Sequence, residues 1–119
     1  MHTAAVVLVA LVAAIHLCIL VLEMFLWSTP KGRATFGTTQ EFAAESAPLA
    51  ANQGLYNGFL AAGLVWGLVE PEPTGTHAQV FILSCVIVAG VYGCLTVSRR
   101  ILFVQSVPAA VALALVLTA

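Results

Sequence analysis

Four long apolar blocks constrain this chain more than any other feature of its sequence. They cover residues 4–27, 48–69, 77–97 and 101–118, and their one Asp, Glu, Lys or Arg is Glu23. Each block is long enough to cross a hydrocarbon core of about 30 Å as a helix that rises about 1.5 Å per residue. Lipid offers the backbone no water, and the blocks do not alternate as barrel strands do. We therefore predict four membrane-spanning helices.

The composition excludes two broad classes of protein. The chain is 61% apolar and 8% charged, whereas soluble domains are about a quarter charged, so it cannot form the surface of a soluble globular monomer. Four Lys and Arg against five Asp and Glu give a net charge of −1, which leaves no basic patch for nucleic acid. The prediction is an all-α fold, a four-helix transmembrane bundle that forms one domain over residues 1–119.

The basic residues predict the orientation of the chain. They lie after the first block and between the third and fourth blocks: Lys31, Arg33, Arg99 and Arg100. The N-terminus, the second connection and the C-terminus contain none. By the positive-inside rule, we expect loops 28–47 and 98–100 to be cytoplasmic and both termini to lie outside.

The first loop is the only long connection. Within it, residues 38–41 (TTQE) have the form of a capping box, which satisfies the first N–H groups of a helix. We expect a short interfacial helix over residues 42–45. Pro48 suits the first turn of the second span, because a proline there gives up an N–H that has no helical partner.

Two ionisable side chains lie inside the first block, His16 and Glu23. Ionisable groups are costly in a membrane, so each is a functional candidate. Seven residues are within about 20° of two full turns, which places both side chains on one helix face. Their axial separation of about 10.5 Å prevents direct contact.

The other blocks add polar side chains at a similar depth. We expect one residue from each block to lie in a common layer below the cytoplasmic interface: Glu23, Tyr92 and Gln105, four or five residues from the cytoplasmic ends of their blocks, and Asn57, nine residues after the start of its block. The second block adds three more near Asn57: Asn52, Gln53 and Tyr56. We predict that these residues form a ligand-binding polar pocket open to the cytoplasm, with His16 as its floor.

A structural interpretation stands beside this prediction. Asn, Gln and Tyr in spans often only join helices, at about 0.6 to 2 kcal/mol per hydrogen bond, and a carboxylate near the interface extends toward water. A metal site needs three or four ligands, and the spans offer only His16 and Glu23 as good ones. We therefore expect no metal and no cofactor.

The sequence resembles one known family. The resemblance is carried by His16 and by three stretches, residues 22–27 (LEMFLW), 29–33 (TPKGR) and 52–63 (NQGLYNGFLAAG). It covers nearly the whole chain and points to the bacterial integral membrane proteins grouped as domain of unknown function 1304. The resemblance implies a small four-span protein of the bacterial inner membrane, and it implies no catalytic residue because the family has no established activity.

Three functions remain in competition. The first is a protein that binds or carries a small ligand, a proton or a cation at Glu23. The second is an accessory or assembly subunit of a larger membrane complex, which would bind another membrane protein through the Gly54/Gly58 and Gly63/Gly67 faces. The same faces are candidates for a homodimer contact. The third is an intramembrane enzyme with Glu23 and His16 as acid and base, which no nucleophile motif accompanies. In all three cases we expect the chain to contact the lipid bilayer.

Overall fold

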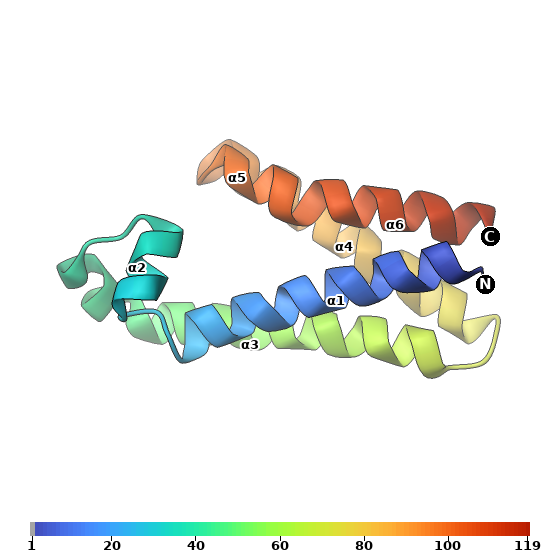
Figure 1. The fold of residues 1–119 in the computed structure, drawn as a ribbon, viewed down its shortest axis with the longest axis horizontal. Helices are drawn as coiled ribbons and strands as arrows, with labels where there is room; N and C mark the ends of the chain where they lie inside the picture. The colour runs from blue at the N-terminus through green and yellow to red at the C-terminus, as the bar shows by residue number, and fades with distance from the viewer. Residues whose placement is uncertain (1) are drawn as a thin grey trace. The chain divides into compact units, whose positions relative to one another are not determined.

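All secondary structure in residues 2–119, the part of the chain that the computed structural model describes, is helical. The elements in chain order are α1 (Thr3–Met24), α2 (Pro30–Phe36), α3 (Gln40–Val69), α4 (Thr74–Thr96), α5 (Arg99–Ile101), the π-helical stretch η1 (Leu102–Ser106) and α6 (Val107–Thr118) (Figure 1). The prediction of an all-α fold is confirmed.

Three helical segments are long and apolar enough to cross a membrane. They are Thr3–Met24, Thr74–Thr96 and the run Arg99–Thr118, which joins α5, η1 and α6. They correspond to the first, third and fourth predicted spans. Their length and composition indicate a membrane protein.

The second predicted span, residues 48–69, lies inside α3, which is not one of these three segments. The middle of α3 carries Asn52, Gln53 and Asn57, and these amides lower the mean hydropathy of the helix. A crossing of the membrane by α3, and with it the four-helix bundle, therefore stays a prediction.

The first loop differs from its prediction. Residues 42–45 are not a separate interfacial helix but belong to the first turns of α3, whose N-terminus is capped by the Thr39 hydroxyl accepting from the Phe42 N–H at 3.1 Å. The prediction for Pro48 was also wrong, because it lies inside α3. A proline backbone fits helical φ, and the residue removes one hydrogen bond without ending the helix. The short helix of this loop is α2.

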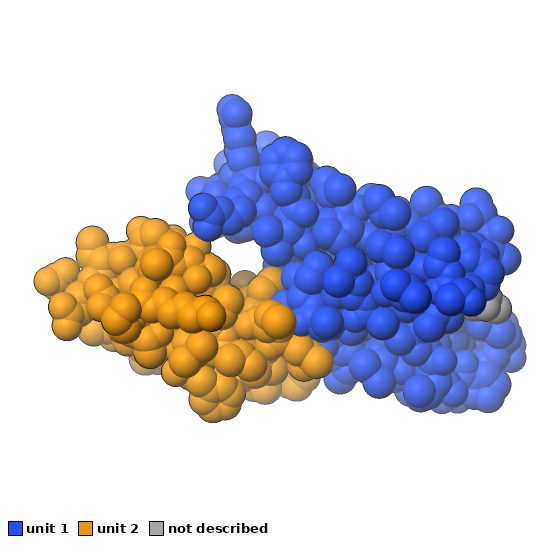
Figure 2. All heavy atoms as spheres, viewed as in Figure 1, with its two compact units in different colours: residues 1–15, 60–119 blue, residues 16–59 orange. Residues whose placement is uncertain are grey.

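The chain forms two compact units (Figure 2). Unit 1 contains residues 1–15 and 60–119, and unit 2 contains residues 16–59. The prediction of one domain over the whole chain stays a prediction.

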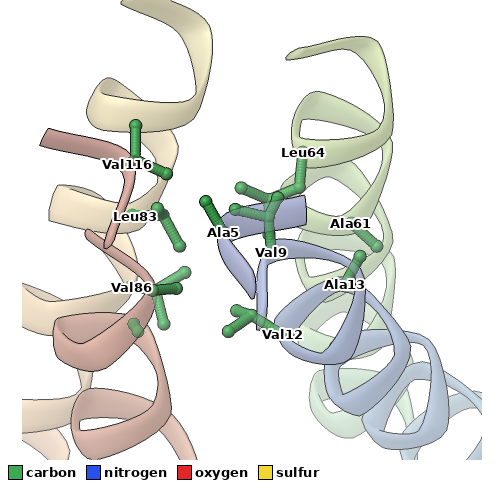
Figure 3. Close-up of a cluster of buried hydrophobic side chains, with 11 residues drawn as sticks. Ala5, Val9, Val12, Ala13, Ala61, Leu64, Leu83, Val86 and Val116 are labelled. Carbon is green, nitrogen blue, oxygen red and sulfur yellow. The ribbon is translucent and has the colours of Figure 1, made fainter. Parts of the chain in front are cut away.

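Small side chains fill the core of unit 1. Figure 3 shows Val9 of α1 near Leu64 of α3, and Val12 of α1 on the side of the cluster that faces Val86 of α4. The core also contains five alanines: Ala5, Ala13, Ala61, Ala109 and Ala112. Lipid tails are as apolar as these side chains, so helices in a membrane are held by close packing rather than by removal of apolar surface from water. Alanines permit that packing because they let backbones approach.

Two buried polar side chains tie α4 to its neighbours in unit 1. The Gln79 amide donates from Nε2 to the Gly67 carbonyl at 2.8 Å, and the Ser106 hydroxyl donates to the Ile87 carbonyl at 2.9 Å. Gln79 is 1% exposed. Gly90 faces Ser106 so closely that a Cβ atom there would lie 3.0 Å from the Ser106 nitrogen. Substitutions at Gly90 therefore force α4 and η1 apart.

We predict that Gly90→Leu destabilises unit 1, because overpacking a tight contact costs about 1–3 kcal/mol. The measurement is thermal unfolding in mild detergent, followed by circular dichroism. Ala89→Leu is the matched control, since Ala89 is the exposed neighbour on α4. An equal melting temperature for the two variants would contradict the packing of α4 against η1.

Candidate functional site

Two glycines of α3 bring this helix close to α1 in unit 2. A Cβ atom on Gly54 would lie 2.7 Å from Met24 Cγ and 3.1 Å from Glu23 Cβ. A Cβ atom on Gly58 would lie 2.6 Å from Leu20 Cδ1. A Cβ atom on Gly54 would press on Met24 and on the start of the Glu23 side chain, so the close contact depends most on Gly54, whereas at Gly58 only the flexible end of Leu20 would have to move.

The close approach joins the Glu23 carboxylate to the Asn57 amide. Asn57 Nδ2 donates to Glu23 Oε1 at 2.8 Å and to the Gln53 carbonyl at 3.1 Å. The two N–H groups of the amide are thus both used, which fixes the orientation of the side chain. Asn57 is 7% exposed, and Glu23 is half-buried.

The Glu23 carboxylate has an amide partner and no cationic one. No Lys, Arg or His within residues 2–119 forms an ion pair with it, and only Oε1 accepts a hydrogen bond from this part of the chain. A carboxylate has about four lone-pair sites. The arrangement therefore leaves Glu23 able to bind a proton, a cation or a hydrogen-bond donor.

An aromatic contact next to this pair holds the end of α1. Trp27 donates from Nε1 to the Ser46 hydroxyl of α3 at 3.1 Å, and its ring lies 4.9 Å from the Phe36 ring of α2. Ser46 in turn donates to the Phe42 carbonyl at 2.6 Å. Trp27 therefore links the chain that follows α1 to both other helices of unit 2, one turn beyond Glu23.

The other predicted site residues of α3 lie at its surface. Asn52, Gln53 and Tyr56 are exposed, and the Tyr56 ring packs edge-on against Phe59 with the centroids 5.8 Å apart. The structure brings Asn57, and not these three side chains, to the Glu23 carboxylate. The Gln53 backbone takes part through its carbonyl group.

His16 is 1% exposed and lies on the same face of α1 as Glu23, two helical turns earlier. Its roles as the floor of a pocket and as a partner of Glu23 in acid–base chemistry stay predictions.

Tyr92 and Gln105 belong to unit 1. Tyr92 is 69% exposed on α4, and Gln105 is half-buried within η1. The π-helical stretch precedes Pro108, and the Val107 N–H bonds to the Leu102 carbonyl five residues back. A common polar layer with Glu23 stays a prediction.

The predicted partner faces make contacts inside the chain. Gly54 and Gly58 pack against α1 in unit 2, and Gly63 and Gly67 pack against Ile82 and Gln79 of α4 in unit 1. Small-x-x-x-small spacing indicates close helix approach but does not tell which helix approaches.

Sequence reasoning missed Gln79 and the bond between Trp27 and Ser46. The signal for Gln79 was its place as a long amide inside an apolar block, which implies a hydrogen-bond partner there. Residues 2–119 contain no group of three or more His, Cys, Asp and Glu side chains that could hold a metal ion.

Comparison with known proteins gives one match. Residues 10–117 match the family described as "Protein of unknown function (DUF1304)". No curated protein and no solved structure matches the chain.

A double-mutant cycle tests the bond between Glu23 and Asn57. We predict that Glu23→Leu and Asn57→Leu each cost about 1–3 kcal/mol in stability, because each leaves one buried polar group without its partner. The double variant should cost less than the sum, by about 0.5–3 kcal/mol. The measurement is reversible unfolding in detergent. A cycle of Glu23→Leu with Gln53→Leu is the control, since only the Gln53 backbone contacts Asn57. Strict additivity in the first cycle would contradict the bond.

Proposed function

Since the chain belongs to the DUF1304 family of proteins of unknown function, we propose that its function lies at the Glu23–Asn57 pair, where a small ligand, a proton or a cation binds. The observation that carries this proposal is the half-buried carboxylate in an apolar helix, held by an amide and by no cation within residues 2–119. If Glu23 served only to join helices, an amide side chain would do so at lower cost in a membrane.

The proposed mechanism assigns different work to the two side chains. Asn57 donates to Oε1 and holds the carboxyl plane in one orientation. The remaining lone pairs of Glu23 receive the ligand, and a change in the charge of Glu23 alters the strength of the bond from Asn57. Because Asn57 also bonds to the α3 backbone, ligand binding at Glu23 is coupled to the position of α3 against α1.

We also propose that α3 crosses the membrane as the second of four spans, in a bacterial inner membrane, with both termini outside. The length of α3, 30 residues, supports the crossing, because about 20 helical residues suffice. The four basic residues support the orientation. In this arrangement Glu23 lies near the cytoplasmic side.

Cysteine labelling in intact cells tests this topology. We expect Ala34→Cys to be protected from a membrane-impermeant maleimide and Thr74→Cys to react, in a chain whose three native cysteines are replaced by alanine. The two positions flank α3 and are exposed. Equal labelling of both from outside would place the two loops on one side and overturn the crossing.

Native mass spectrometry on mildly extracted protein tests the function. We expect wild type to retain a non-lipid ligand that Glu23→Gln loses, because the glutamine oxygen still accepts from Asn57 but carries no charge. Glu45→Gln, at an exposed carboxylate of α3, is the control and should keep the ligand. If the ligand is a proton, the measurement is the proton flux into vesicles that contain wild type, Glu23→Gln or Glu45→Gln. Unchanged binding and flux in Glu23→Gln would overturn the proposal.

A second candidate function is an accessory subunit, which the exposed amides of α3 favour. Asn52 and Gln53 are costly if they face lipid, and a partner helix with its own amide would satisfy them. This candidate predicts that another membrane protein is extracted together with the chain. The double variant Asn52→Leu/Gln53→Leu should lose this partner, and Glu23→Gln should keep it. Extraction of a bare chain would argue against it.

A further inference from the structure

A surface hollow on unit 2 lies apart from the Glu23–Asn57 pair. It has a volume of about 360 Å³ and is lined by Leu17, Cys18, Val21, Leu22, Leu26 and Lys31. The hollow is widely open to its surroundings and is a shallow surface groove rather than an enclosed pocket. Its lining residues are apolar except for Lys31, so its chemistry differs from that of the polar pair.

Three of the four α1 residues that line the hollow, Leu17, Cys18 and Val21, lie on the flank of the helix away from Glu23. Cys18 and Val21 lie about 140–160° around the helix from Glu23. Leu17 is 48% exposed and Val21 is 44% exposed, although α1 is one of the segments long and apolar enough to span a membrane. In a membrane, lipid chains cover this flank.

The local structure after α1 fixes Lys31 at the hollow. Lys31 lies in the first turn of α2, whose N-cap is Thr29. The Thr29 hydroxyl donates to the Leu26 carbonyl at 2.6 Å and accepts from the Gly32 N–H at 3.2 Å. These bonds tie the start of α2 to the residues that follow α1, and they thereby fix the backbone at Lys31 next to the hollow.

The charge of the lining determines the occupant. An acyl chain matches the apolar lining, and a cation where α1 ends matches an anionic headgroup, since lysine binds phosphate as a point charge. Arg33 adds a second positive charge two residues later, with Nε donating to the Ser28 carbonyl at 3.3 Å. Glu23, the one carboxylate of α1, lies on the other flank.

We propose that this hollow is a binding site for an anionic phospholipid, with an acyl chain along Leu17, Val21 and Leu22 and the headgroup phosphate on Lys31. The site is independent of the ligand proposed at Glu23. It places a negatively charged lipid against the junction of α1 and α2. The lipid thereby stabilises the position of α2 at the membrane surface.

Photo-cross-linking in lipid nanodiscs tests this site. The full chain is placed in phosphatidylcholine nanodiscs with a trace of phosphatidylglycerol that carries a diazirine on its acyl chain, or with phosphatidylcholine carrying the same probe. Mass spectrometry then maps the labelled residues. We expect the phosphatidylglycerol probe to label residues 17–26 several-fold more than the phosphatidylcholine probe does. Equal labelling by the two probes would overturn the proposal.

Two pairs of variants separate the contribution of the lipid headgroup to binding from that of the acyl chain. Lys31→Glu should abolish the preference for phosphatidylglycerol, because it reverses the charge. Lys31→Arg should keep the preference, because it keeps the positive charge. Cys18→Trp should lower the labelling by filling the hollow while Lys31 remains, and Cys18→Ser should not. A preference for phosphatidylglycerol that survives Lys31→Glu, or labelling that is unchanged in Cys18→Trp, would contradict the site, whatever the outcome at Glu23.

Discussion

The hydrogen bond from Asn57 to Glu23 is the interaction on which our account of unit 2 depends. It gives a carboxylate in an apolar helix a partner from the neighbouring helix at 2.8 Å. Glycine at position 54 permits this close approach of α3 to α1, because a Cβ atom there would lie 2.7 Å from Met24 Cγ and 3.1 Å from Glu23 Cβ. The close packing of α3 against α1 and the hydrogen bond between their side chains therefore occur at the same place. The candidate functional site lies there.

The same physical rule describes unit 1. Where apolar contact alone brings little advantage over lipid, buried amides and hydroxyls join the helices by binding carbonyl groups, as Gln79 does at Gly67 and Ser106 does at Ile87. These bonds use the protein's own backbone, whereas the bond at Glu23 joins two side chains. A partner on a side chain can be exchanged for a ligand more readily than a partner on a helix backbone.

The sequence predicts the helices well and the contacts between them poorly. Block length and composition determine that the chain is helical, because lipid permits little else. The start of α2 has a local signal, Thr29 followed by Pro30, which the capping-box pattern ten residues later obscured. Depth along each span indicated that Glu23 and Asn57 lie near one another. It could not tell that Asn52, Gln53 and Tyr56 face outward, because that depends on the rotation of α3 set by its glycines.

A direct measurement of the pair tests the central claim. Magic-angle-spinning NMR on the protein in lipid bilayers measures the dipolar coupling between the labelled carboxyl carbon of Glu23 and the labelled side-chain nitrogen of Asn57. We predict a measurable coupling, because Asn57 Nδ2 donates to Glu23 Oε1 at 2.8 Å and the carboxyl carbon lies one bond beyond that oxygen. The absence of a measurable coupling would contradict the pair, and with it the site at which we propose that a ligand binds.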